Sequence, residues 1–384
     1  NDLKTVSYVD DFYLCDDASL IEGKIEYAIQ ELGKLGWHIN LEKSCFTPKT
    51  ECKFIGFLVQ TGVGDKAVGL KVPKNRIDKV NKDIKRIFKK GQATARALAR
   101  IAGQIVSMTK AVTPAKLLLR NLYRCLRSRT SWQDLLALDM ETIKDLRWWL
   151  KAFEAWNGKA FRHQNISIEI ATDASAEGWG ATMFPSGLKA QGYWTIEQSY
   201  KSSNFRETLA VLLGLLAFLS QVKGKSVTIL SDNVSAVCYI NMQGGPAMEL
   251  SRIAREMWSL ALKYNIQLKA QHLKGVLNVQ ADTLSRLSSQ YEWCLHQKVY
   301  DYLNVLWGPH TIDRFATMAT TKCIKYNSRF LDPASMGVDA LLQGDWGLEN
   351  NYVNPPIRLL DQVLDIMCRQ QATATVIAPE WKAQ

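Results

Sequence analysis

Histidine is scarce in this sequence, and closely spaced cysteine is absent. Only five of the 384 residues are histidine, and none is spaced as zinc ligands usually are. The eight cysteines include no Cys-x-x-Cys pair, which is typical of reduced thiols in an intracellular protein. We therefore expect no structural zinc, no disulfide framework and a cytoplasmic or nuclear location.

Long apolar runs are also missing. The longest, Leu209 to Leu219, has 11 residues, whereas a membrane span needs roughly 20. It predicts a buried helix, and we expect no membrane partner. The chain opens on Asn1 rather than Met and shows no signal peptide, so we expect a fragment that is truncated at its start and at Gln384.

Positive charge is abundant and unevenly placed. The net charge is +11, and the stretch from Asp65 to Arg129 holds 18 Lys or Arg against three acids. Such an imbalance predicts a basic face for a polyanion. Solvated helix faces without a partner are the alternative.

A strand from Ile166 to Ile170 is followed by an acid and a glycine-rich turn. Isoleucine alternates with polar residues in this strand, and Asp173 follows at its carboxyl end. A second strand, Trp179 to Phe184, returns from the turn. Alone, Asp173 has the ordinary interpretation of a turn former.

Further acids follow downstream, each at the edge of a predicted element. A third strand (Gln191 to Ile196) precedes a helix from about Asn204 to Leu219, where Glu207 fits either a capping box with Asn204 or a functional site. The remaining candidates are Asp232 after the strand Val227 to Leu230, His272 on a loop after the strand Ile266 to Ala270, and Asp282 in a helix starting at Asn278.

This order of strands, helices and acids resembles the ribonuclease H domain. The interval of ten residues from His272 to Asp282 also agrees with that of the ribonuclease H family, and the sequence from Ala281 to Arg286 resembles that of retrotransposon domains. The resemblance implies two Mg²⁺ (or Mn²⁺) ions, because in-line phosphodiester hydrolysis uses paired ions and oxygen ligands. By resemblance, the metal ligands are Asp173, Glu207, Asp232 and Asp282, the proton-transfer or product-release residue is His272, and the substrate-binding residues are Asn233, Asn278 and Arg286.

The first residues carry a second motif. Tyr8-Val9-Asp10-Asp11 places two acids between apolar residues. Their like charges and their desolvation cost free energy, and a bound metal ion would lower that cost. With the segments that follow, this motif resembles the palm hairpin of reverse transcriptases. In that family the counterparts of Asp10 and Asp11 bind magnesium and that of Lys43 lies near the incoming triphosphate. The upstream aspartate and the fingers are absent, so we expect no primer extension by this chain alone.

Basic helices follow the palm-like segment. Ile77, Val80, Ile84 and Ile87 have helical spacing, and reverse transcriptases have a helical thumb at this point, which grips duplex phosphates. A connecting segment carries Trp132, Trp148, Trp149 and Trp156. These rings either pack in a core or stack on bases.

The last hundred residues predict a small α/β unit with one helix, Leu359 to Arg369. Asn354-Pro355-Pro356 resembles the substrate loop of adenine methyltransferases, which receives a flipped base. Ile357 replaces the aromatic residue of that loop, and the glycines of a cofactor loop are lacking near Asp313. We therefore expect a degenerate domain that does not bind S-adenosylmethionine.

The sequence thus predicts a multidomain α/β protein from a retrotransposon polyprotein of the DIRS or Ngaro type. The expected segments are a partial polymerase palm (1–72), a helical thumb (73–130), a connection (131–164), a ribonuclease H-like mixed sheet with flanking helices (165–289) and a methyltransferase-like segment (290–384). The expected function is cleavage of the RNA strand of RNA/DNA hybrids. The alternative is a non-catalytic remnant that binds nucleic acid; a recombinase of related fold is disfavoured by the palm-like segment.

Overall fold

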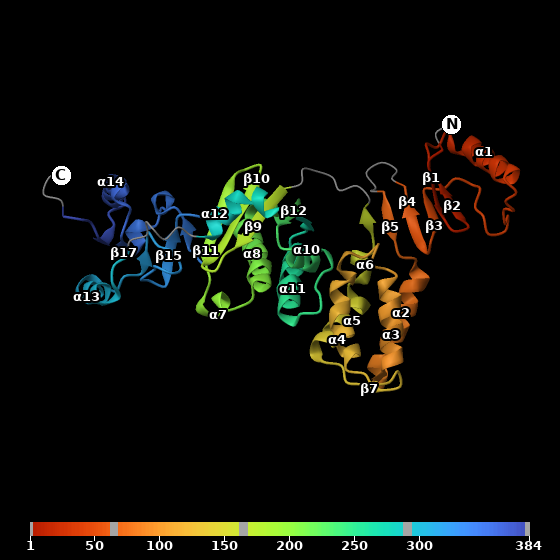
Figure 1. Ribbon diagram of the computed structural model, residues 1–384, viewed down its shortest axis with the longest axis horizontal. Helices are drawn as coiled ribbons and strands as arrows, with labels where there is room; N and C mark the ends of the chain where they lie inside the picture. Colours follow the sequence, from red (N-terminus) through yellow and green to blue (C-terminus); the bar gives the residue numbers. More distant parts are fainter. Residues whose placement is uncertain (1–2, 62–67, 161–167, 287–293, 381–384) are drawn as a thin grey trace. The chain divides into compact units, whose positions relative to one another are not determined.

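The computed structural model describes residues 3–61, 68–160, 168–286 and 294–380. The chain divides into two compact units, residues 1–164 and 165–384, and each combines helices with strands (Figure 1). The predicted α/β class is therefore confirmed. The predicted boundaries at 164 and 289 lie outside the described residues. No helix within the described ranges is long and apolar enough to cross a membrane.

The first unit begins with elements that bury little surface. Strands β1 (Thr5–Tyr8) and β2 (Asp11–Leu14) form an antiparallel hairpin, and helix α1 (Ile21–Lys34) follows. Among residues 3–50 only Ile21 is buried. This segment therefore has almost no hydrophobic core of its own.

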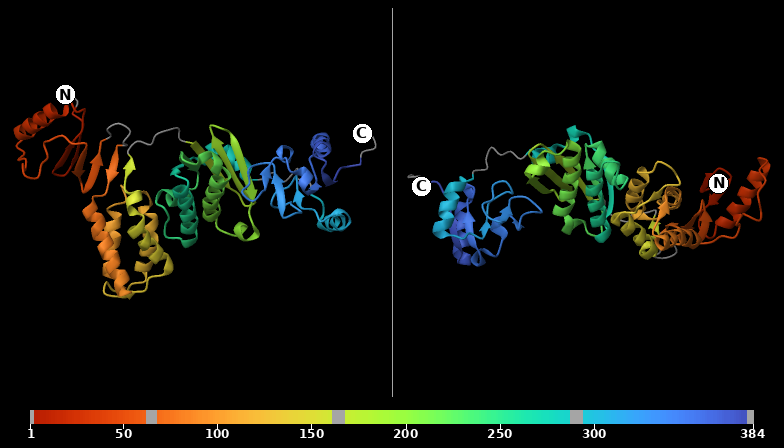
Figure 2. Two further views of the ribbon diagram at one scale, coloured as in Figure 1. Left: turned by 180° about the vertical axis from the view of Figure 1, so that it is seen from behind. Right: turned by 90° about the horizontal axis from the view of Figure 1, so that it is seen from below.

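A small sheet and a helical bundle complete the first unit. Strands β3 (Glu51–Phe54), β4 (Phe57–Gln60), β5 (Gly69–Lys71) and β8 (Lys159–Ala160) pair antiparallel in that order. Helices α2 (Lys74–Lys90), α3 (Ala95–Val106), α4 (Arg120–Arg127) and α5 (Met140–Lys151) pack side by side (Figure 2). The predicted helical spacing is confirmed, because the four isoleucine and valine positions in α2 are all buried.

The tryptophans of the connecting segment serve mainly in packing. Trp149 is fully buried in the core of the bundle, and Trp148 and Trp156 pack partly buried against it. Trp132 differs, since it is 46% exposed and lies under the guanidinium of Arg129, 4.2 Å from the ring centre.

The second unit is built on a mixed sheet. Its strands β9 (Ile168–Ala174), β10 (Gly178–Phe184), β11 (Leu188–Tyr193), β12 (Ser226–Ser231) and β13 (Gln267–His272) lie in the order β11-β10-β9-β12-β13. The first three are antiparallel, and β9, β12 and β13 run parallel. Apolar side chains on both faces explain why helices cover the sheet on both sides.

Helices α8 (Ser203–Ala217) and α12 (Val279–Ser285) pack on opposite faces of this sheet. Gly214 in α8 lies against Ala181, while the neighbouring residue Gly180 lies against α12; successive strand residues face opposite ways. Helices α10 (Val234–Asn241) and α11 (Met248–Lys263) join α8.

Several predicted boundaries were wrong. The third strand is β11, which ends at Tyr193, because Thr195 and Gln198 form a capping box that starts a short helix α7 (Ile196–Ser199). His272 is the last residue of strand β13, paired with Ser231, and not a loop residue. Ile166, where the first strand was expected to begin, lies outside the described residues.

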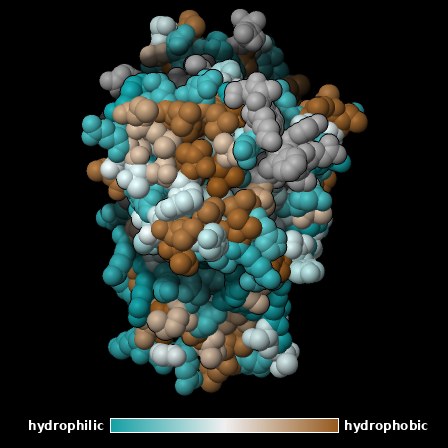
Figure 3. Space-filling model, turned by 90° about the vertical axis from the view of Figure 1, so that its left-hand side faces the viewer, coloured by the Kyte–Doolittle hydropathy of each residue, from teal (hydrophilic) through white to brown (hydrophobic). Residues whose placement is uncertain are grey.

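Residues 294–380 form the predicted α/β segment, with a second sheet. Its strands are β14 (Ile312–Asp313), β15 (Lys325–Ser328), β16 (Gly337–Val338), β17 (Asn350–Val353) and β18 (Thr373–Val376), all parallel in the order β16-β15-β14-β17-β18. Helices α13 (Gln297–Trp307) and α14 (Leu360–Gln370) accompany it. The prediction of a single helix was wrong, since only α14 was expected. Apart from the buried Tyr300, α13 exposes apolar side chains such as Val305, and apolar and polar groups are intermixed on the face shown in Figure 3.

Gly180 is the point of closest approach between sheet and helix α12. A Cβ atom there would lie 2.5 Å from the carbonyl oxygen of Ala281 and 2.6 Å from Cβ of Leu284. We predict that Gly180→Ala lowers the free energy of unfolding of the second unit by about 1–3 kcal/mol, measured by chemical denaturation. Gly344→Ala is the control, because a Cβ atom at Gly344 would meet no atom within 4 Å. Equal stability of the two variants would contradict the packing described here.

Candidate metal centre

Two acids of the candidate site come from neighbouring parallel strands. Asp173 is near the carboxyl end of β9, and Asp232 directly follows β12. Leu230 of β12 pairs with Ala171 of β9, so extending the register by two residues sets Asp232 opposite Asp173. Parallel strands end at the same edge of a sheet, which explains why acids far apart in sequence meet there.

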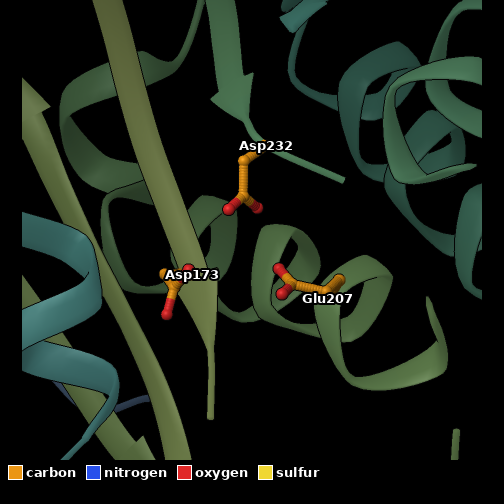
Figure 4. A group of neighbouring side chains, drawn as sticks. All are labelled: Asp173, Glu207 and Asp232. Carbon is orange, nitrogen blue, oxygen red and sulfur yellow. The ribbon is translucent and has the colours of Figure 1, made fainter. Parts of the chain in front are cut away.

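The third acid comes from the start of helix α8. The helix is capped by Ser202, whose hydroxyl accepts a hydrogen bond from the Phe205 N–H, 3.3 Å away. Of the two interpretations of Glu207, the capping box with Asn204 was therefore wrong, because the N-cap is Ser202, two residues before Asn204. Glu207 is instead buried, with its carboxylate turned toward Asp173 and Asp232 (Figure 4).

The three carboxylates form one compact group. One oxygen from each of Asp173, Glu207 and Asp232 lies within 4.8 Å of the other two. Asp173 and Glu207 are 8% and 7% exposed. The Oε2 atom of Glu207 is buried and has no hydrogen-bond partner among the described residues. An acceptor atom in that position fits a bound cation.

The electrostatics of the group point the same way. Burial, and after it the charges of Asp173 and Asp232, raises the pKa of Glu207 to about 8. Burial also raises the pKa of Asp173, and the hydrogen bond from Ser285 opposes that rise. A divalent cation would relieve both the burial cost and the repulsion. Mg²⁺ and Mn²⁺ favour such oxygen ligands, so the residues present fit the metal that the sequence implies.

Asp282 is not part of this compact group. Its carboxylate is half-exposed and accepts hydrogen bonds from Arg286, with Nη2 to Oδ1 at 2.7 Å and Nε to Oδ2 at 3.0 Å. Its charge nevertheless contributes to the raised pKa of Asp173. The predicted fourth ligand thus lies beside the site, paired with the residue predicted to bind substrate.

His272 lies at the rim. Its ring is exposed, and Nε2 is 3.1 Å from the backbone carbonyl oxygen of Asp232. Gly275 is also close, because a Cβ atom there would be 3.0 Å from Oδ2 of Asp232.

Two predicted substrate residues hold the backbone around the site. The Asn233 side chain caps α10 by accepting from the Ala236 N–H at 2.8 Å and donates to Oδ1 of Asn204 at 2.9 Å. Asn278 is buried, and its amide donates to the carbonyl oxygen of Thr172 at 3.0 Å. Asn278 therefore ties the start of α12 to strand β9.

The acids of the first unit are placed differently. Asp10 lies in the exposed turn of the β1–β2 hairpin, and Asp11 is the exposed first residue of β2. In the turn, Val9 has a φ of 53°, a strained value for a β-branched residue. Among the described residues Asp10 and Asp11 form no cluster with a third metal-ligating side chain. Lys43 is exposed, and its backbone N–H donates to Oδ1 of Asn40 at 3.1 Å.

The Asn-Pro-Pro segment follows strand β17 at the carboxyl edge of the second sheet. Pro355 is buried, whereas Pro356 and Ile357 are exposed. Asp313 lies at the same edge and accepts from the backbone N–H groups of Phe315 and Lys322. Burial raises the pKa of Asp313 to about 6. These bonds close the loop after β14, which gives Asp313 a structural role.

Two buried residues were missed by the sequence analysis. Arg314 is buried directly after β14 and donates to Asn351 at 2.7 Å and to Asp345 at 2.8 Å. Strand β14 has only two residues, so no alternating pattern in the sequence indicated that Arg314 is buried. Ser285 donates to Oδ2 of Asp173 at 2.6 Å. Its position within the Ala281 to Arg286 motif was the only available indication.

No protein-family model and no curated protein matches the chain. Several solved structures are similar. The foamy viral protease-reverse transcriptase dRH in complex with double-stranded DNA has a TM-score of 0.37 at 15% identity, over 70% of this chain and 46% of that one. The foamy viral protease-reverse transcriptase with RNA/DNA hybrid gives 0.36 at 14% identity, over 71% and 36%.

A further match covers a smaller part of the chain. RNase H1 from Halobacterium salinarum has a TM-score of 0.28 at 12% identity, over 33% of this chain and all of that one. The chain spans less than half the length of the two foamy viral proteins. Because all three TM-scores are below 0.5, the function proposed below rests on the residues of this chain.

The raised pKa of Glu207 has a consequence for stability. Its value in the folded state, about 8, exceeds the ordinary 4.5, so folding favours the protonated form. This contribution is fully present below pH 4.5 and is lost as pH rises through 8. It amounts to roughly 5 kcal/mol at most.

We predict that the metal-free protein, kept in chelator, loses stability between pH 5 and pH 8 and that Glu207→Gln loses less. Chemical denaturation of both proteins at several pH values measures the difference. If the free energy of unfolding changes with pH in the same way in both proteins, the pKa of Glu207 is not raised as described here.

Proposed function

We propose that the second unit is a divalent-metal-dependent endonuclease that cleaves the RNA strand of RNA/DNA hybrids. The observation that carries this proposal is the group of three carboxylates, two of them buried, with oxygens within 4.8 Å of one another. Such a group costs free energy unless a cation binds it. Buried acids with raised pKa values are typical of functional sites.

Asp173, Glu207 and Asp232 would hold the metal, and Asp282 lies close enough for its charge to act on Asp173. The ions, when bound, supply an activated water and stabilise the leaving oxygen. The chain itself fixes where this happens. Asp173 lies in β9, Asp232 directly follows the adjacent strand β12, and Glu207 lies in helix α8, so the sheet and the helix packed on it set the spacing of the acids.

His272 is suited to moving a proton at the edge of the site. Its ring is exposed beside the backbone of Asp232, and histidine is the side chain that most often transfers protons in catalysis. The predicted role in proton transfer or product release is retained as part of this proposal.

Basic side chains of the first unit would contribute to binding of the nucleic-acid substrate. Helix α2 carries eight Lys or Arg against two Asp along its 17 residues, which suits the phosphates of a duplex. Choice of RNA over DNA would rest on contacts to 2′-hydroxyl groups.

We further propose that the parent protein is a reverse transcriptase of a DIRS- or Ngaro-type retrotransposon. Asp10 and Asp11 would belong to its polymerase site. No S-adenosylmethionine-dependent reaction is proposed for residues 294–380. An exposed Ile357 stands where the loop of methyltransferases has an aromatic residue, and Asp313 is engaged by backbone donors.

The test uses a hybrid with a labelled RNA strand in the presence of Mg²⁺. We predict cleavage of the RNA strand by the wild-type chain and a loss of at least about 100-fold in Asp232→Asn, because a metal ligand is removed. Gel analysis of both strands gives the rates. Asp301→Asn is the matched control, since Asp301 is an exposed acid of α13 in the same unit.

The alternative is a non-catalytic module that only binds nucleic acid. Absent cleavage by both the wild type and Asp232→Asn, together with salt-sensitive hybrid binding in fluorescence anisotropy, would establish that alternative.

A further inference from the structure

The last turn of helix α12 lies directly against the strand that carries Asp173. Gly180 pairs with Asp173 across strands β9 and β10, and a Cβ atom at Gly180 would lie 2.6 Å from the backbone nitrogen of Ser285. The missing side chain therefore lets Ser285 approach the sheet beside the acid. Ser285 is fully buried.

Ser285 is held in this place from both sides. Its hydroxyl oxygen is 2.6 Å from Oδ2 of Asp173 and 2.9 Å from the carbonyl oxygen of Asp282. Its own carbonyl oxygen accepts from the hydroxyl of Ser175 at 2.7 Å. A hydroxyl has a single proton, and a distance of 2.6 Å to a carboxylate is typical of a charge-assisted bond. The proton is therefore directed to Asp173.

We propose that Ser285 is a positioning residue of the carboxylate site. By holding Oδ2 of Asp173, its hydroxyl fixes the rotation of that carboxylate beside Glu207 and Asp232, whose side chains point toward it in Figure 4. The inference rests on the function proposed above, because it assigns Ser285 a role toward the metal that these acids would bind.

The position of Ser285 also explains why α12 matters beyond Asp282. Two consecutive residues at its C-terminal end each form a hydrogen bond with one acid. Ser285, the last residue of α12, binds Asp173, and Arg286, which follows it, binds Asp282. Metal sites depend on such outer partners, which orient the ligands and whose loss typically weakens metal binding by about 10- to 100-fold.

The competing explanation is that the hydroxyl only stabilises the end of a helix. Ser199 offers a control for that explanation. Its hydroxyl donates to the carbonyl oxygen of Ile196, three residues earlier, at 2.8 Å, in the same arrangement as Ser285 and Asp282, but its hydrogen bond goes to no carboxylate. The test compares Ser285→Ala, Ser285→Thr and Ser199→Ala in the full chain. Mn²⁺ affinity is measured by titration calorimetry and stability by thermal unfolding.

We expect Ser285→Ala to bind Mn²⁺ about 10- to 100-fold more weakly and to cleave hybrid with a lower kcat at unchanged KM. Ser285→Thr keeps the hydroxyl and should restore most of the affinity, and Ser199→Ala should bind as the wild type does. If Ser285→Ala does not fold, Ser285→Cys keeps nearly the same volume with a weaker donor, and the same loss is expected.

Wild-type Mn²⁺ affinity in Ser285→Ala, or in Ser285→Cys if that variant is needed, would overturn the inference while leaving the endonuclease proposal standing. A wild-type chain that neither binds Mn²⁺ nor cleaves hybrid would overturn both.

Discussion

The central constraint on the second unit is the electrostatic repulsion among three carboxylates that the fold places close together. Asp173 and Glu207 are buried, Asp232 is partly buried, and one oxygen of Glu207 has no hydrogen-bond partner among the described residues. Burial and like charge both oppose ionisation. A folded protein tolerates such an arrangement when a ligand compensates it, so metal binding and stability are expected to be linked.

The elements around the acids can be understood from this constraint. Two parallel strands carry Asp173 and Asp232 to one edge of the sheet, and Ser202 starts α8 so that Glu207 reaches the same place. The absence of a side chain at Gly180 brings α12 close, and Ser285 then bonds to Asp173. The site is therefore rigid because it is built on strands and helices. The first 50 residues differ, since they bury only Ile21 among the described positions.

The sequence predicted those features that depend on local pattern. Alternating isoleucines and short apolar runs revealed the strands that end at Asp173 and Asp232, and helical spacing revealed the core of α2. It did not predict what depends on tertiary contacts. Glu207 fitted a capping box equally well, and only the packing of α8 shows that Ser202 is the cap. Likewise, the contact of Ser285 with Asp173 joins residues that are far apart in the sequence, and a serine at the end of a helix carries no distinctive pattern.

The central claim is that Asp173, Glu207 and Asp232 together form a divalent-metal site. Crystals of the chain soaked in Mn²⁺ and measured for anomalous scattering test it most directly. The account predicts an anomalous peak between the three side chains, at about 2.2 Å from one oxygen of each, as is usual for such ions. The absence of a peak there, with Mn²⁺ bound at other acids, would contradict it.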